Sequence, residues 1–350
     1  MSAAVRFSAL FPAPAPAEAA ALPQALQLRA GEPLGVWRVV TALPACESGR
    51  WYAVEHSLAA TQKALVLVYQ RAEEGMPLLL RMAEQAGMAA GLGGGLLVNA
   101  LDSGVTADGL PYIVFPPQEG QPLLAASAEL PLRQRLQLAV QLCEGLQTLR
   151  PDGLVLRELD PGLLWLATGQ QLRLMNLGLA DLADEPSPMG PRWVSAAQAF
   201  VSPELQESSA PSLASESYAA GMLACWLANG RPLRRHDEQL LQSSAAVSGL
   251  NAAERLGLEA LLRKAIAPLP TQRHHSVREL GEDLRAWLAG RNSSALTFTP
   301  MPQPAANDES AGGEPVRPLF VPAFDGSADQ PTAPGGLRGL AARALAWLRR

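Results

Sequence analysis

The stretch Gly153-Leu-Val-Leu-Arg-Glu-Leu-Asp-Pro-Gly-Leu-Leu-Trp-Leu166, with Leu172-Arg-Leu-Met-Asn-Leu-Gly-Leu179 shortly after it, decides how this chain is interpreted. Short apolar runs interrupted by Pro and Gly predict a strand, a turn with a short loop, and then a further hydrophobic strand. The charged side chains of the first run are Arg157, Glu158 and Asp160. The rest of this stretch has none of the charged side chains that catalysis commonly uses, so few residues in it are candidates for a catalytic role.

The residues before this stretch have the pattern of a sheet. From about Gly35 to Pro117, short apolar and β-branched runs alternate with Gly, Pro and polar residues, as in an antiparallel sheet. The predicted strands are residues 36–40, 51–54, 64–69 and 111–115. Apolar residues at helical spacing predict one helix among them, over Met76–Ala90.

Helices dominate from Pro131 onward. We expect Pro131 to be the first residue of a helix, and a second helix over the nearly all-apolar run Tyr218–Ala228. The spacing Ser276-x-x-Glu279 predicts a capping box at the start of a third helix, which ends at Gly290. A small β-rich half followed by a larger helical half predicts an α+β, two-lobed fold.

The composition excludes several classes of protein. The net charge of −5 gives no reason to expect a nucleic-acid partner. Cys46, Cys143 and Cys225 lie far apart and only four histidines are present, so we expect neither a disulfide framework nor a metal site. No run reaches the length of a membrane span, and Met1–Leu10 is too short an apolar run for a signal peptide. We therefore expect a cytoplasmic protein.

Both ends of the chain differ from the middle in composition. Residues 1–30 are rich in Pro and Ala and predict a flexible segment, and residues 291–335 predict a disordered linker. Residues 336–350 have leucines on one helical face and arginines elsewhere, which predicts a short basic amphipathic helix. Such a helix is suited to a membrane surface, to the groove of a partner protein, or to folding back on its own domain.

The order of residues in the opening stretch resembles the catalytic loop and metal-binding loop of a protein kinase. The family pattern is His-Arg-Asp-Leu-Lys-Pro-x-Asn, then a hydrophobic strand, then Asp-Phe-Gly. This chain has Leu156-Arg-Glu-Leu-Asp-Pro-Gly-Leu163 and later Asn176-Leu-Gly178. The resemblance to a bacterial Ser/Thr protein kinase implies a kinase-like domain over residues 31–290, with an N-lobe at 31–117 and a C-lobe at 121–290.

Further motifs follow in the order of the family. Leu110–Leu123 resembles the hinge between the lobes, Phe200–Glu204 the Ala-Pro-Glu element, Glu216–Gly221 the Asp-x-Tyr-Ser-Leu-Gly helix start, and Pro270–Arg273 the Pro-x-x-Arg element. The resemblance implies a buried ion pair between Glu204 and Arg273. It gives structural roles to Pro203, Glu204, Glu216, Gly221 and Arg273.

The positions that hold nucleotide in the family are mostly changed here. Only Gly49 fits the Gly-rich loop, whose glycines let backbone amides approach phosphates. The position of the strand Lys is Leu67, which has no charge, and Lys63 lies four residues earlier. Glu84 lies near the position of the helix Glu that pairs with that Lys. We expect Glu84 to be a solvated helix residue instead.

The positions of the catalytic loop are changed in part. The two metal-ligand positions are Leu163, which offers no oxygen, and Asn176, a neutral amide where a carboxylate is expected. The catalytic-base position is Glu158, which is still a carboxylate, and the preceding Arg157 is retained. The adjacent Lys position has become Asp160, whose negative charge opposes a phosphate.

These differences predict a pseudokinase, a kinase-like domain that binds a partner protein and has weak or absent affinity for ATP and magnesium. One alternative is an atypical active Ser/Thr kinase that uses Glu158 and Asn176, with Lys63 or an Arg in place of the missing Lys. Another is an adaptor at the inner face of the membrane, held there by residues 336–350.

Overall fold

The computed structural model describes residues 27–46, 48–71, 79, 95–127, 129–148, 153–157, 159–175, 180–184, 199–207, 210–230, 240–241, 247, 249–291 and 294–297. The chain divides into two units, Met1–Met301 and Pro302–Arg350, and all of these residues belong to the first. The predicted segment 336–350 and, apart from Leu79, the predicted helix Met76–Ala90 lie outside the described residues. Within the described part, no helix combines the length and the apolar character that crossing a membrane requires.

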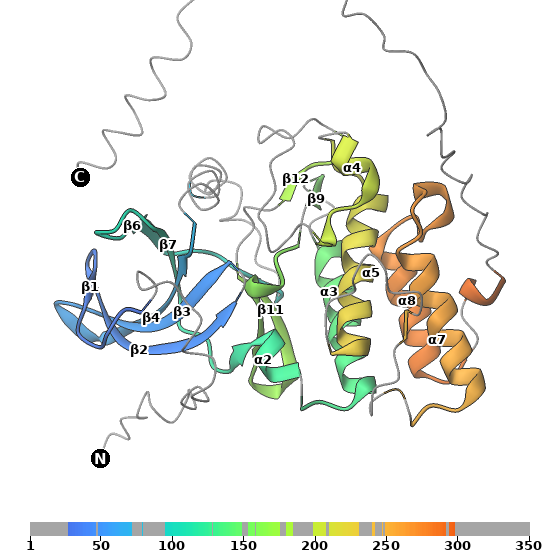
Figure 1. The fold of residues 1–350 in the computed structure, drawn as a ribbon, viewed down its shortest axis with the longest axis horizontal. Helices are drawn as coiled ribbons and strands as arrows, with labels where there is room; N and C mark the ends of the chain where they lie inside the picture. Colours follow the sequence, from blue (N-terminus) through green and yellow to red (C-terminus); the bar gives the residue numbers. More distant parts are fainter. Residues whose placement is uncertain are drawn as a thin grey trace, which may run out of the picture. The chain divides into compact units, whose positions relative to one another are not determined.

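A six-stranded antiparallel sheet forms the first lobe (Figure 1). Its strand order is β1-β2-β3-β4-β7-β6. The strands are β1 (Pro33–Leu34), β2 (Trp37–Cys46), β3 (Gly49–His56), β4 (Ala59–Tyr69), β6 (Asp102–Val105) and β7 (Pro111–Phe115). The four predicted strands are thus confirmed as β2, β3, β4 and β7, of which the first three extend further than their apolar cores.

Both faces of this sheet are buried. Trp51, Leu67 and Ile113 are cross-strand neighbours on β3, β4 and β7, and they face the main core of the molecule. Their chain neighbours, such as Tyr52 and Val66, face a separate apolar cluster on the other side of the sheet. Because successive side chains of a strand point to opposite faces, burial on both sides requires an unbroken apolar run, and Ala64–Tyr69 supplies it.

The opening stretch of sequence forms small strands beside the helical lobe. Its residues form β9 (Leu154–Leu156), the 3₁₀ turn η5 (Pro161–Leu163), β10 (Leu164–Ala167) and, after the turn η6 (Thr168–Gln170), β11 (Gln171–Met175). β10 and β11 join β5 (Leu97–Val98) and β8 (Gln121–Pro122) in a sheet of order β5-β11-β10-β8, and β9 pairs with β12 (Ala180–Leu182). The strand and loop predicted there are confirmed.

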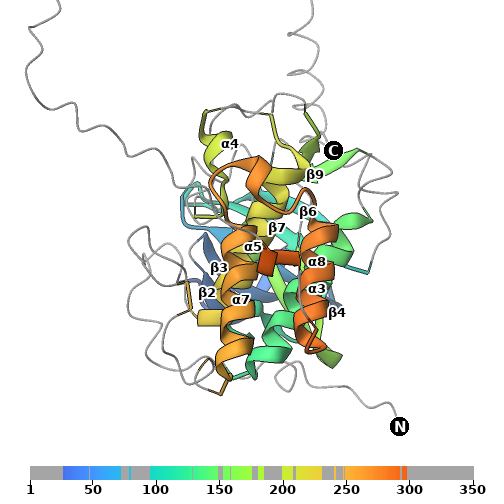
Figure 2. The same ribbon diagram turned by 90° about the vertical axis from the view of Figure 1, so that its right-hand side faces the viewer.

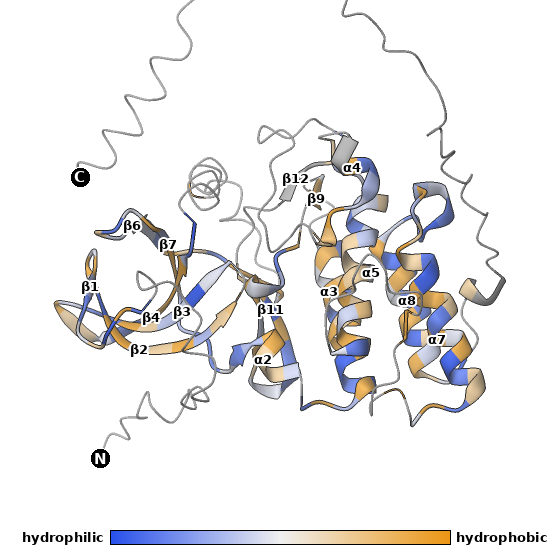
Figure 3. Ribbon diagram, viewed as in Figure 1, coloured by the Kyte–Doolittle hydropathy of each residue, from blue (hydrophilic) through white to orange (hydrophobic). Residues whose placement is uncertain are grey.

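Helices make up the rest of the second lobe. They are α2 (Leu123–Ser127), α3 (Leu132–Gln147), α4 (Pro203–Glu207), α5 (Leu213–Asn229), α7 (Ala252–Ala265) and α8 (Val277–Leu288), with 3₁₀ turns η8 (Pro270–Gln272) and η9 (Ser294–Thr297). α3 and α5 lie side by side, with α7 and α8 packed against them (Figures 1 and 2). The helix faces toward this core are apolar and those away from it are polar (Figure 3). The predicted order, β-rich and then helical, is confirmed.

Two predicted helix starts need correction. Pro131 is the residue before α3 and not its first helical residue, since its backbone is extended with ψ 147°. At α8, Ser276 precedes the helix but its side chain makes no capping hydrogen bond, and the Glu279 carboxylate accepts from the backbone N–H of His275 and not from that of Ser276. Reciprocal capping boxes occur where we did not predict them, at the starts of α5 and α7.

Candidate functional site

The Gly-rich loop position is a tight hairpin between β2 and β3. Gly49 pairs with Cys46 across the hairpin and with Tyr69 on β4. A Cβ on Gly49 would lie 2.0 Å from the carbonyl oxygen of Val68, so only glycine fits there. The one glycine retained from the family pattern thus has a packing role within the sheet.

This hairpin contacts η5, which follows the catalytic-base position. Ser48 Oγ donates to Asp160 Oδ2, and the backbone N–H of Gly162 donates to Asp160 Oδ1 over 2.7 Å. The indole Nε1–H of Trp51 donates to the carbonyl oxygen of Gly162 over 3.1 Å. Ser48 and Asp160 are each only 1% exposed, so these contacts form in a buried place.

Gly162 lets the hairpin approach this closely. A Cβ on Gly162 would lie 2.7 Å from Sγ and 2.9 Å from Cβ of Cys46, and 3.0 Å from Oδ1 of Asp160. No side chain can be added there without moving the hairpin or the loop. The hairpin and the loop are therefore in direct van der Waals contact.

Apolar side chains occupy two positions that would hold charges and metal in the family. Leu67 and Leu163 are fully buried, and both belong to one apolar core that includes residues of the sheet and of the helical lobe. Trp51 lies at its centre, with ring centroids 5.4 Å from Trp165 and 5.7 Å from Phe115. Both positions therefore belong to the apolar core.

The other predicted site residues are only partly described. Glu84, Glu158 and Asn176 lie outside the described residues. Arg157 is buried at 1% exposed. Lys63 is half-buried and pairs with Glu55 in the register of β3 and β4, four residue pairs along the ladder from the pair Trp51–Leu67.

The metal prediction concerns the same region. Among the described residues, no three His, Cys, Asp or Glu side chains converge as ligands for a metal ion. Asp160, the carboxylate nearest to the metal-ligand positions in sequence, is directed toward Ser48 and Gly162. Octahedral magnesium needs several oxygen ligands, and the predicted ligand position Asn176 lies outside the described residues.

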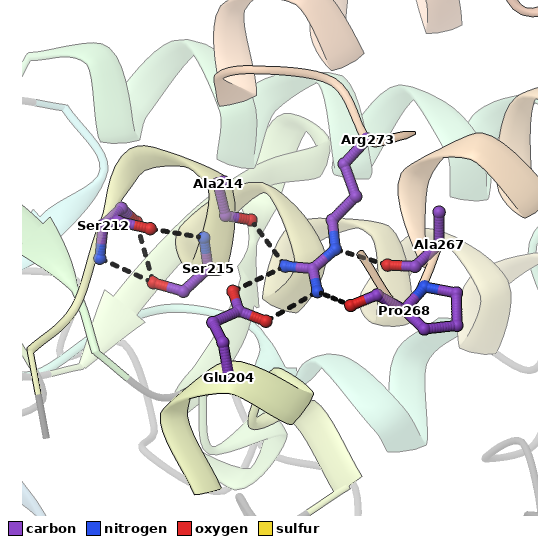
Figure 4. Close-up of polar contacts among 7 residues, drawn as sticks. All are labelled: Glu204, Ser212, Ala214, Ser215, Ala267, Pro268 and Arg273. Atoms are coloured by element: carbon purple, nitrogen blue, oxygen red, sulfur yellow. Dashed lines mark hydrogen bonds and ion pairs between the residues drawn. The ribbon is translucent and has the colours of Figure 1, made fainter. Parts of the chain in front are cut away.

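The ion pair implied by the resemblance joins α4 to the segment before α8 (Figure 4). Arg273 Nη1 and Nη2 donate to the two oxygens of Glu204 over 2.7 and 2.6 Å. The guanidinium also donates to the carbonyls of Ala267, Pro268 and Ala214. Burial alone would raise the pKa of Glu204, but the hydrogen bonds from Arg273 outweigh it and lower that pKa.

Two more residues of the predicted structural set tie α5 to its surroundings. The buried carboxylate of Glu216 accepts from the backbone N–H of Leu156 over 2.8 Å, which fixes β9 to the start of α5. A Cβ on Gly221 would lie 2.8 Å from Cβ of Ala265, so the glycine allows α5 and α7 to approach. Pro203 begins α4, a position that suits proline.

A polar cluster around Asp283 was not predicted. Its carboxylate contacts His274 Nε2 at 3.0 Å and accepts from the backbone N–H and Oγ of Ser294. Lys264 Nζ donates to Ser294 Oγ over 2.8 Å. The cluster fixes η9 to α8. The sequence contains no signal for it beyond the individual residues.

Parts of several known bacterial protein kinases are similar in sequence to this chain. No family model matches the chain. The Ser/Thr protein kinase PknK of Mycobacterium tuberculosis H37Rv is 26% identical over 278 residues, which are 73% of this chain and 25% of that protein. The Ser/Thr protein kinase Pkn2 of Myxococcus xanthus is 25% identical over 333 residues, which are 88% of this chain and 39% of that protein. The chain thus spans about a quarter of the length of PknK.

The solved structures show the same fold. The kinase domain of Mycobacterium tuberculosis PknI superposes with a TM-score of 0.53 at 20% sequence identity, covering 74% of this chain and 99% of that one. A single-mutant form of the same domain gives a TM-score of 0.55 at 22% identity, over 74% and 98% of the two chains. The chain therefore contains a protein-kinase-like domain, with the two-lobed fold of the bacterial Ser/Thr protein kinases.

Proposed function

We propose that this domain is a catalytically impaired protein kinase, a pseudokinase, which acts by binding a partner protein as a regulatory or scaffold module. The observation that carries the proposal is the direct contact of the β2–β3 hairpin with η5. In the family the corresponding hairpin covers the phosphates of the nucleotide. Here the side chains of Ser48 and Trp51 donate hydrogen bonds directly to Asp160 and to Gly162.

The charges of the site support the same proposal. Phosphoryl transfer depends on positioning and on neutralising the charge of the phosphates. Leu67 offers no cation, Leu163 offers no oxygen, and Asp160 adds a negative charge. Each charge-stabilising group that is lost costs a factor of about 10² or more in rate, so losing several leaves little transfer. Binding of ATP and magnesium is expected to be weak or absent.

A titration with Mg-ATP tests the proposal. A ligand that binds only the native state stabilises it by RT ln(1 + [L]/Kd), so the melting temperature rises as the ligand concentration exceeds Kd. We expect no rise in melting temperature at up to millimolar ATP, either with magnesium or after a chelator has removed it. A saturable rise that depends on magnesium would contradict the proposal.

An active kinase is the second candidate, and the intact frame around the catalytic loop favours it. Arg273 pairs with Glu204, Glu216 holds the start of β9, and Arg157 is buried. The relatives are named as kinases. In this candidate Glu158 is the base and Asn176 a metal ligand. Transfer of labelled phosphate from ATP that disappears in Glu158→Ala would establish it, and equal signals in both proteins would remove it.

An adaptor role at a membrane rests on residues 336–350 alone. Their arginines and leucines suit the surface of an anionic bilayer. Flotation with vesicles that contain anionic lipid, compared between the full chain and a chain without residues 336–350, tests it. Equal flotation of the two proteins would end this alternative.

A further inference from the structure

We propose that Ser48 and Asp160 form a latch that holds the β2–β3 hairpin closed on the helical lobe without nucleotide. The inference rests on the proposed function, because it explains how the lobes stay together when nothing binds between them. In this view the Asp160 carboxylate takes the place of a ligand's phosphate as the acceptor for a hairpin donor. The contact lies within the chain itself, so closure needs no second molecule.

The chemistry of Asp160 makes the hydrogen bond from Ser48 strong. The carboxylate is 1% exposed and accepts from Ser48 Oγ and from the backbone N–H of Gly162. A hydrogen bond to a buried carboxylate contributes more than one between neutral groups, and removing its donor leaves an acceptor that must be solvated again. Opening the hairpin removes that donor.

A second hydrogen bond, next to the one between Ser48 and Asp160, also joins the hairpin to η5. Trp51 donates its indole N–H to Gly162, and its ring packs on Trp165 of β10. Cys46, on the other strand of the hairpin, occupies the space that a side chain at position 162 would need. The hairpin therefore meets η5 through a charge-assisted hydrogen bond, a neutral one and a packed surface.

The chain carries its own reporter for this latch. All three of its cysteines are described, and they form no disulfide. Cys143 and Cys225 are fully buried, and desolvation raises the pKa of the Cys225 thiol to about 12 and that of Cys143 further. Cys46 is partly exposed and touches the latch. A thiol reagent therefore labels Cys46 first on the native protein, and the change that a variant causes in this rate reports whether it loosens the hairpin from η5.

The experiment follows the labelling rate of Cys46 in the full chain, without nucleotide, using an aromatic disulfide reagent. We expect Ser48→Ala to accelerate labelling by about tenfold or more, since a hydrogen bond to a charged group is lost. Asp160→Ala should accelerate it similarly, and the double variant no more than the faster single one. Ser57→Ala, in the turn at the other end of β3, should label at the parent rate because Ser57 is exposed and distant from η5.

Each result decides the matter. Equal rates in the parent and Ser48→Ala, or an equal acceleration in Ser57→Ala, would overturn the latch. Labelling of more than one thiol shows that a variant has lost its fold. In that case exchange of the Trp51 indole proton in the parent decides: slow exchange supports closure, and exchange as fast as an exposed indole refutes it. No nucleotide is involved, so this outcome stands apart from the Mg-ATP titration.

Discussion

Replacing Leu67 by lysine tests whether the nucleotide position has become core. Leu67→Lys restores the residue that the family has at this position of β4. Leu67 is 0% exposed, and its cross-strand neighbours on the same face are Trp51 and Ile113. If that face is apolar core, the new ammonium enters a place where burial disfavours its charge. Its pKa should then fall by several units, as for buried lysines generally.

The size of the effect follows from linkage. A lysine titrates near pH 10.4 in the unfolded chain, and one that is neutral in the folded state at pH 7 costs ~1.36 kcal/mol for each of the ~3.4 pH units between. The free energy of unfolding should therefore drop by ~4–5 kcal/mol at pH 7. Because the unfolded state binds the extra proton, stability should rise again as the pH approaches 10.4. Loss of the leucine's packing adds a part that pH does not restore.

Urea denaturation at pH 7 and at pH 10 measures both parts. The matched control is Thr61→Lys, on the same strand but exposed, which should change stability by less than ~0.5 kcal/mol at either pH. A Leu67→Lys protein as stable as the parent at pH 7 would refute the reasoning. So would magnesium-dependent stabilisation of that variant by ATP, because the position would then still be a functional cation site.

Three further changes test the frame of the domain. Arg273→Lys should lower the free energy of unfolding by ~3 kcal/mol, because lysine cannot make the bidentate pair with Glu204, and an unchanged urea midpoint would contradict this. Asp283→Asn should lower the free energy of unfolding by ~2 kcal/mol at pH 7. Burial alone would raise the pKa of the Asp283 carboxyl, but hydrogen bonds from neighbouring groups outweigh it and lower that pKa from 3.8 to about 2. The stability that the carboxylate contributes is therefore present above pH 3.8 and lost as the pH falls from 3.8 to 2. Parallel acid denaturation curves for that variant and the parent would disprove the assignment. Gly221→Ala should lower the melting temperature, since its Cβ would come within 2.8 Å of Ala265; an unchanged value would show that α7 can move away.

Much of the fold could be predicted because burial leaves a periodic trace in sequence. The run Ala64–Tyr69 has no alternation, which is what a strand buried on both faces requires. The first half of β4, Ala59–Lys63, was not predicted, because it is largely exposed and has no apolar run. Local pattern marks the buried part of a strand and gives no information about its exposed extension.

Capping was predictable in principle but was assigned to the wrong helix. Ser276 and Glu279 have the spacing of a capping box, yet the Glu279 carboxylate binds the N–H of His275, one residue earlier. Asn251 and Glu254 have an equivalent spacing and do form a box at α7. The difference lies in the path of the chain before each helix, which a four-residue spacing does not specify.

The contacts of the candidate site could not be predicted from local pattern. Ser48 and Asp160 are 112 residues apart in the chain, and nothing near either residue indicates the other. From the sequence, Asp160 was interpreted only as a negative charge at a position where the family has a lysine. Glu204 and Arg273 are 69 residues apart, but their pairing was expected, because a resemblance to a known fold implies long-range pairings that residue spacing does not.

The frame contacts and the latch act on the same short segment from opposite sides. Glu216 holds Leu156 at the end of β9 from α5, and Ser48 and Trp51 hold Asp160 and Gly162 from the sheet, with only two described residues, Arg157 and Leu159, between Leu156 and Asp160. A loop that no longer needed a fixed geometry would gain nothing from being held twice. Fixing it without a nucleotide keeps the surrounding surface in one arrangement, and a preformed surface loses less entropy when a partner binds. The retained frame and the substituted positions are therefore compatible with the proposed role, in which a partner protein recognises this domain.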